Sequence, residues 1–234
     1  MVELALAAYL VLVLPARAIW KSLRQPAPLQ TNRAARYART SGLIAILLLV
    51  IGGDWWWSGR PWSGLGFDFP LSARGEIGLV VSILLIVTML VIAQFSERRL
   101  SEEKRAAQRA KLEGNELLPR TAGELRRFLI LSLLVGAGWE VLYRGFLLWF
   151  LAPHVGTVVS VCVAALAYGL AHGYRSRGQF IGSIVSAFAF TIAFAATHSL
   201  WWLMLLHTFF AVYGGLTSYR MFRGSESELA YAKP

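Results

Sequence analysis

The chain has 234 residues, of which 56% are hydrophobic, and 23 Lys and Arg against 13 Asp and Glu give it a net charge of +10. In a soluble protein this charge would suggest nucleic-acid binding, but here the basic residues are gathered in segments between apolar stretches. The pattern predicts a single-domain polytopic membrane protein without a nucleic-acid partner. The one cysteine, Cys162, lies in an apolar run and excludes a disulfide within the chain.

Seven stretches are apolar over roughly the 17–25 residues that a transmembrane helix needs. In chain order they are residues 3–20, 41–57, 76–95, 127–150, 155–172, 180–197 and 199–219. The first has no basic stretch before its apolar part and no small-residue cleavage site, so we expect a retained helix and not a signal peptide. The sequence thus predicts an all-α transmembrane helical bundle of about seven spans.

The basic residues also predict how the chain is oriented. Twenty of the 23 lie in residues 17–39, in residues 98–127, in the connection at 175–177 and in the C-terminal tail. Seven spans place these four segments on one side, so the positive-inside rule predicts an outside N-terminus and a cytoplasmic C-terminus. We expect a bacterial inner membrane, with the Trp-rich stretch DWWWSGRPW (54–62) at its outer interface.

The longest polar stretch divides the chain. Residues 1–95 are expected to hold N-terminal transmembrane helices, and residues 96–126 a cytoplasmic connector. Within the connector, an Ala-rich charged segment predicts a helix that ends near Gly114 and Asn115. Residues 117–219 are expected to hold the core with the functional helices, in the C-terminal half.

Two charges lie inside a predicted span. Among the acidic residues, Glu140 is the one well inside a hydrophobic segment, and Arg144 follows it by four residues. This spacing puts the two side chains on one helix face within pairing distance. Charges inside a membrane are costly and commonly mark a functional site, although an ion pair that locks two helices together would have the same pattern.

Two histidines on other spans are candidates for the same site. His172 ends the fifth predicted span, one turn after Tyr168, and His207 lies near the middle of the seventh. Two imidazoles and a carboxylate from three helices can converge in a bundle core, where they can hold Zn²⁺ or a reactive water. Each histidine can equally be a packed core residue. The remaining histidines, His154 and His198, are expected at the surface or interface.

These motifs resemble the CAAX protease and bacteriocin-processing family of intramembrane proteases, also called the Abi or type II CAAX prenyl endopeptidase family. The family's first motif, Glu-Glu-x-x-x-Arg with a following Gly, corresponds to WEVLYRG (139–145). Its second motif, an aromatic residue four before a His, matches Tyr168 and His172. The third, His-x-x-x-Asn/Asp after a Leu-Trp-rich start, is similar to SLWWLMLLHTFFA (199–211).

The resemblance implies an intramembrane metalloprotease that cleaves a membrane-associated peptide or protein in the lipid bilayer. It assigns Glu140, Arg144, His172 and His207 to the catalytic site, and Glu140, His172 and His207 to a Zn²⁺ ion. Prenylated C-termini, bacteriocin leaders and sorting-related membrane peptides all fit as substrates.

Two positions depart from the family pattern. Trp139 stands where the family has the first Glu, thought to activate water, and Ala211 stands where it has Asn or Asp. An indole cannot act as a base. Either Glu140 has become the general base, or the chain is a pseudoprotease that binds a peptide or partner. A small transporter is the alternative outside this family, because it would also use intramembrane Glu, Arg and His.

Overall fold

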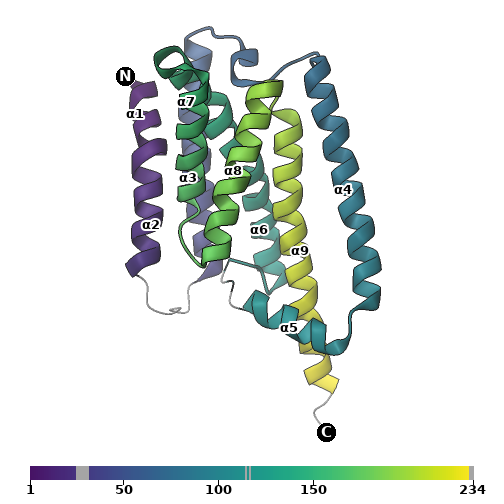
Figure 1. The fold of residues 1–234 in the computed structure, drawn as a ribbon. Helices are drawn as coiled ribbons and strands as arrows, with labels where there is room; N and C mark the ends of the chain where they lie inside the picture. Colours follow the sequence, from purple (N-terminus) through teal and green to yellow (C-terminus); the bar gives the residue numbers. More distant parts are fainter. Residues whose placement is uncertain (25–31, 114, 116, 232–234) are drawn as a thin grey trace.

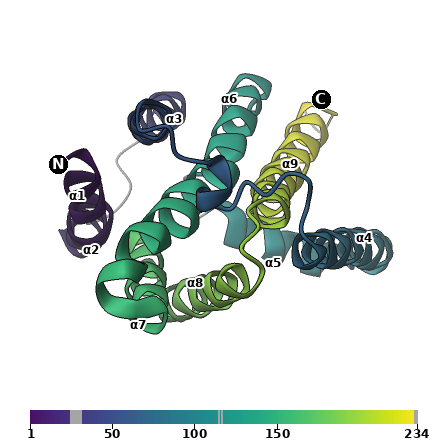
Figure 2. The ribbon, with the colours of Figure 1, turned by 90° about the horizontal axis from the view of Figure 1, so that it is seen from above.

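The computed structural model describes residues 1–24, 32–113, 115 and 117–231. Most of these residues are helical and none lies in a β-strand, so the all-α prediction is confirmed. Figure 1 shows the long helices side by side in an elongated bundle, with the first helical rod and α4 at opposite edges. Figure 2, seen along the bundle, shows α6 and α9 between these edges.

The N-terminal half contributes a first rod, two further long helices and a short surface helix. Their bounds are α1 (Val2–Ala8), η1 (Tyr9–Val13), α2 (Leu14–Arg24), α3 (Arg33–Trp57), η2 (Trp62–Leu65), α4 (Ala73–Arg99) and α5 (Glu102–Glu113). The π-helical η1 joins α1 to α2 without a break, which makes one rod of the three. The end of α5 agrees with the helix end predicted near Asn115; Gly114 lies outside the described residues.

The C-terminal half is one long helical run followed by two helices. The elements are α6 (Ala122–Leu133), η3 (Leu134–Gly138), η4 (Val141–Phe146), α7 (Leu147–Ala171), α8 (Arg177–Thr197) and α9 (Trp201–Tyr231). Thr121 and Glu124 form a reciprocal capping box that starts α6. Gly156 interrupts α7 with φ 77° and ψ 160°, a backbone conformation that glycine adopts without strain.

Five helical stretches of the described chain are long and apolar enough to cross a membrane. They are Val2–Arg24, Arg33–Trp57, Ala73–Ser96, Ala122–Ala171 and Arg177–Thr197. The fourth has 50 residues and contains the fourth and fifth predicted spans, and its break at Gly156 lies near the start of the fifth. The seventh predicted span lies in α9, which is not among the five. The expected number of about seven therefore agrees roughly with the structure.

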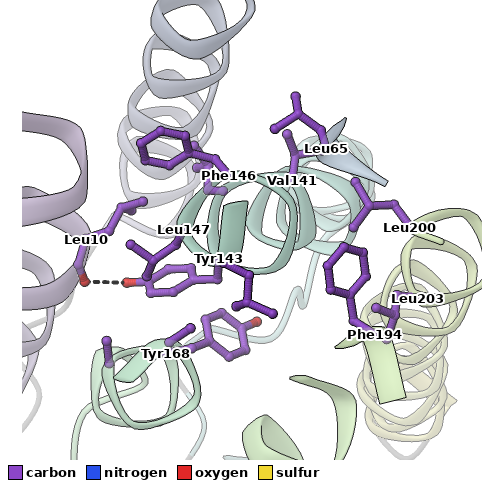
Figure 3. Close-up of a cluster of buried hydrophobic side chains, with 14 of the residues drawn as sticks. Leu10, Leu65, Val141, Tyr143, Phe146, Leu147, Tyr168, Phe194, Leu200 and Leu203 are labelled. Atoms are coloured by element: carbon purple, nitrogen blue, oxygen red, sulfur yellow. Dashed lines mark hydrogen bonds between the residues drawn. The ribbon is translucent and has the colours of Figure 1, made fainter. Parts of the chain in front are cut away.

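The largest apolar cluster joins the first rod to the C-terminal half. In Figure 3, Leu10 of η1 lies beside Tyr143 of η4, whose hydroxyl donates a hydrogen bond of 3.0 Å to the Leu10 carbonyl oxygen. Phe146 and Leu147 in the same region are fully buried. This contact fixes the first rod against the segment that carries Glu140 and Arg144.

Glycines allow the helices of the C-terminal half to approach closely. A Cβ atom on Gly136 in η3 would lie 2.5 Å from the backbone N of Thr208 in α9, and one on Gly169 would lie 3.0 Å from Cα of Ile184 in α8. Small residues at such contacts are typical of helices packed within a membrane. The Gly136 contact brings α9, one residue from His207, against the helix that carries Glu140.

Candidate active site

A buried ion pair forms the centre of the site. Arg144 Nη1 lies 3.1 Å from Glu140 Oε1, and the two side chains are 0% and 1% exposed. Arg144 also donates from Nε to Thr191 Oγ1 of α8 at 3.2 Å. Glu140 lies between the π-helical segments η3 and η4, and such local widening of a helix is frequent at functional sites.

His207 of α9 makes the shortest hydrogen bond in the site. Its Nδ1 lies 2.7 Å from Glu140 Oε1, so this one oxygen accepts from both His207 and Arg144. A carboxylate only accepts hydrogen bonds, so Nδ1 carries the hydrogen and the other ring nitrogen, Nε2, is an acceptor. Carboxylate, imidazole and guanidinium thus form one connected group.

Tyr168 of α7 lies against this group on the side of Nε2. Its hydroxyl is 3.4 Å from His207 Nε2, a long hydrogen bond, and its ring faces the Arg144 guanidinium at 4.2 Å from the ring centroid. The guanidinium charge over the ring is a favourable cation–π contact. Tyr168 thereby places a hydroxyl donor beside the imidazole nitrogen that faces away from Glu140.

His172 is next to this group and contacts it through Tyr168. Its ring lies 4.7 Å from the Tyr168 ring, edge to face, and its Nδ1 is 2.9 Å from the Tyr168 carbonyl oxygen. The carbonyl only accepts, so Nδ1–H donates and Nε2 is left as an acceptor. His172 is exposed, whereas His207 is partly buried, with 22% of its side chain exposed.

The loop after His172 is held by the first rod. Gly173 has φ 69°, and Ser22 of α2 accepts a hydrogen bond of 2.9 Å from the backbone N–H of Tyr174. The Ser22 hydroxyl in turn donates to the carbonyl oxygen of Ala18 at 2.8 Å. Both partners of Ser22 are main-chain atoms, so this contact fixes the path of the loop and with it the end of α7.

The two positions that depart from the family pattern carry no catalytic group. Trp139 is partly buried, packs on the apolar core and lies 5.8 Å, ring to ring, from Tyr143. Tyr143 is the residue that donates a hydrogen bond to the first rod. Trp139 therefore lies on a face of its helix that packs against other parts of the protein. Ala211 follows His207 by one turn of α9 and has no hydrogen-bonding side chain.

The candidate metal ligands do not form a three-ligand set in the structure. Glu140 and His207 are in contact through Oε1 and Nδ1, and both histidine rings contact the Tyr168 ring. The described residues contain no group of three or more His, Cys, Asp or Glu side chains placed to hold a metal ion. Zinc remains a prediction from the resemblance, to be checked by the metal content of the purified protein.

The other two histidines lie at the surface, as the sequence predicted. His154 is exposed, and its Nδ1 is 2.8 Å from the Phe150 carbonyl oxygen of its own helix. His198 is exposed at the end of α8, where its left-handed conformation, φ 51°, terminates the helix. Neither contacts the group around Glu140 in the part of the chain that is described.

Sequence reasoning did not find Thr191, the hydroxyl role of Tyr168, or Ser22. Thr191 is a single hydroxyl residue within the apolar stretch AFTIAF, and a threonine there is ordinary in a packed membrane helix. Tyr168 was assigned only as the aromatic residue of a motif. Contacts of this kind depend on how helices distant in sequence are arranged, so nothing in the local pattern points to them.

One protein family matches the segment that holds these residues. Residues 121–213 match the family described as type II CAAX prenyl endopeptidase Rce1-like. The matched segment contains the Glu140, Arg144, Tyr168, His172 and His207 positions and lies within the core predicted at 117–219. No curated protein and no solved structure matches the chain.

Residues 121–213 are therefore similar to the type II CAAX prenyl endopeptidase Rce1-like family. The resemblance read from the sequence motifs is confirmed. This match and the apolar helices together indicate an integral membrane protein.

Proposed function

We propose that the chain is an intramembrane endopeptidase in which His207, oriented by Glu140, activates the attacking water. The observation that carries the proposal is the 2.7 Å hydrogen bond between Glu140 Oε1 and His207 Nδ1. A carboxylate on one imidazole nitrogen fixes the tautomer and the orientation of the ring, the arrangement that general-base histidines use. This pair supplies a base without a carboxylate at position 139.

The proposed reaction is the hydrolysis of a peptide bond. His207 Nε2 takes a proton from water while the water oxygen bonds to the carbonyl carbon. The proton then passes to the amide nitrogen, the C–N bond breaks, and the products are a carboxylate and an amine. The Tyr168 hydroxyl, 3.4 Å from Nε2, is the donor placed to bind the carbonyl oxygen as it becomes negative.

The contacts of Glu140 favour His207 over Glu140 as the base. One oxygen of Glu140 already accepts hydrogen bonds from Arg144 and His207, so it is engaged by these two partners. His207 is also the more exposed of the two, at 22% against 1% for the side chain. Water and substrate therefore reach the imidazole more easily than the carboxylate.

The proposed substrate is a membrane-associated peptide or protein, cleaved close to its point of attachment. The helices that carry Glu140 and Tyr168 belong to the apolar 50-residue stretch Ala122–Ala171, so a bond that reaches them must enter the depth of a membrane helix. Prenylated C-termini, bacteriocin leaders and sorting-related membrane peptides are the candidates.

A second candidate is a pseudoprotease that uses the same fold to bind a membrane peptide without cleaving it. Two observations favour it: the Trp139 indole packs on the core at the family's carboxylate position, and Ala211 offers no hydrogen bond. Under this alternative the Glu140–Arg144 pair is structural.

The test uses the full chain in liposomes and a fluorescence-quenched peptide ending in a farnesylated CAAX sequence. We expect the native chain to cleave it, and His207→Ala and Glu140→Gln to lose about 10²–10⁴-fold, the usual contribution of general-base catalysis. His154→Ala is the matched control and should keep full activity, because His154 is exposed and bonds only its own helix.

Trp139→Glu separates the two candidates. If His207 is the base, this variant should not exceed the native rate. A native chain that is inactive, while Trp139→Glu cleaves the peptide and His172→Ala abolishes that gain, would establish the pseudoprotease. If neither the native chain nor Trp139→Glu cleaves it, and circular dichroism shows both to be folded, the chain is not an endopeptidase for this class of peptide.

A further inference from the structure

The exposed face of α2 combines three cations and an indole. Arg17, Trp20, Lys21 and Arg24 are all exposed, and their spacing of three, four and seven residues places them on one side of the helix. Ser22 faces the opposite way, toward the α7–α8 loop. The helix is therefore divided into a face that contacts protein and a face that does not.

In the described part of the chain, none of these cations has an anionic partner. Among the residues that the structure describes, no ion pair involves Arg17, Lys21 or Arg24, and α2 contains no acidic residue. By contrast, Arg60 near the other end of the bundle pairs with both Glu3 and Asp54. As far as the structure describes the chain, the three positive charges on α2 are thus available to a partner outside it.

The aromatic residue of this face is held by one of the cations. The Arg24 guanidinium lies 3.7 Å from the centroid of the Trp20 ring, and Trp20 is 57% exposed. Leu23, which directly precedes Arg24, is 74% exposed. An indole beside basic residues at the end of an apolar span is the arrangement found where a helix leaves the hydrocarbon and enters the headgroup layer.

The position of α2 leaves this face open to lipid. Figures 1 and 2 show the first rod at the edge of the bundle, with α3 and α7 as its neighbours. The rod Val2–Arg24 is long enough to span a membrane, and α2 is its end. The cations therefore lie at the level of the headgroups, in the leaflet on the side of His172.

We propose that Arg17, Lys21, Arg24 and Trp20 form a binding site for the phosphate headgroup of an anionic phospholipid, such as phosphatidylglycerol. The three cations neutralise the phosphate, and the indole packs on the glycerol and upper acyl region. This site is independent of the proposed catalytic function. It lies on the reverse side of the helix whose Ser22 holds the loop after His172.

The test measures which lipid lies against Trp20. The full chain is placed in nanodiscs that mix phosphatidylglycerol and phosphatidylcholine, with bromine, a tryptophan quencher, on the acyl chains of one lipid or of the other. The difference between the native chain and Trp20→Phe isolates the Trp20 signal. We expect brominated phosphatidylglycerol to quench it more strongly than brominated phosphatidylcholine at equal mole fraction, and high salt to reduce the difference.

Charge variants decide whether the preference belongs to this face. We expect the preference for phosphatidylglycerol to fall in the triple variant Arg17→Gln/Lys21→Gln/Arg24→Gln. The fall should be at most about fivefold for each cation removed. The matched control Lys104→Gln/Arg105→Gln/Arg109→Gln removes three cations from α5, two of them exposed and one partly buried, and should leave the preference for phosphatidylglycerol unchanged. If the α2 triple variant does not fold, Arg24→Gln alone should still lower the preference. Equal quenching by both lipids in the native chain, or the same loss in the α5 control, would overturn the proposal.

Discussion

At the scale of single residues, one oxygen atom organises the site. Glu140 Oε1 accepts from Arg144 on its own helix and from His207 on α9. The first partner follows from a spacing of four residues and was expected from the sequence. The second depends on the approach of α9, which the sequence does not specify. Removing Glu140 therefore affects a local and a long-range contact together.

The ion pair gives a stability prediction. Glu140→Ala leaves Arg144 buried with only Thr191 and the Tyr168 ring as partners, and we expect a loss of about 3–5 kcal/mol in the free energy of unfolding. Glu140→Ala combined with Arg144→Leu should be more stable than Glu140→Ala alone, because no charge is left unpaired. Thermal unfolding in detergent measures both. Equal stability of the two variants would show that the residues are not coupled.

At the scale of helices, close packing at glycine determines where His207 lies. Gly136 in η3 meets the backbone of Thr208, so the helices that carry Glu140 and His207 approach more closely than side chains normally permit. The local sequence LLVGAGWE indicates a packed membrane helix but not which helix it meets. The π-helical turns on either side of Glu140 were also unexpected, because the apolar pattern there fits an ordinary α-helix.

Gly136→Ala tests this contact. A Cβ atom would lie 2.5 Å from the Thr208 backbone N, so α9 must move away, and we expect a loss of about 1–3 kcal/mol together with a loss of any peptide cleavage. Gly214→Ala on α9 is the matched control, because no atom lies within 4 Å of a Cβ there. Unchanged stability and activity in Gly136→Ala would mean that this contact does not position His207.

At the scale of the whole molecule, periodicity and charge were sufficient to predict the helical bundle. They predicted an all-α chain and the approximate number of spans. They did not indicate that the fourth and fifth predicted spans belong to one stretch broken at Gly156. Nor did they indicate that the first rod contacts the site, since Tyr143 reaches Leu10 across more than 100 residues of sequence.

Orientation across the membrane is a prediction that cysteine labelling checks. In a Cys162→Ser background, we expect Ser58→Cys to react with an impermeant maleimide on intact cells, because it lies beside the Trp-rich stretch assigned to the outer interface. Ser101→Cys should react only after the membrane is permeabilised. Both serines are exposed, so access to each depends on the side of the membrane. The opposite result would invert the predicted orientation.

The pairing of Glu140 with Arg144 inside one helix has a consequence for biosynthesis. A growing chain presents its helices to the insertion machinery in order, so the helix that contains both charges arrives before α8 and α9. An unpaired charge at the centre of an inserting helix costs about 2.5–3.5 kcal/mol. Because the two charges are one turn apart, they neutralise each other before Thr191 and His207 have been synthesised. The helix can thus enter the bilayer early, and the histidine joins a carboxylate already in place.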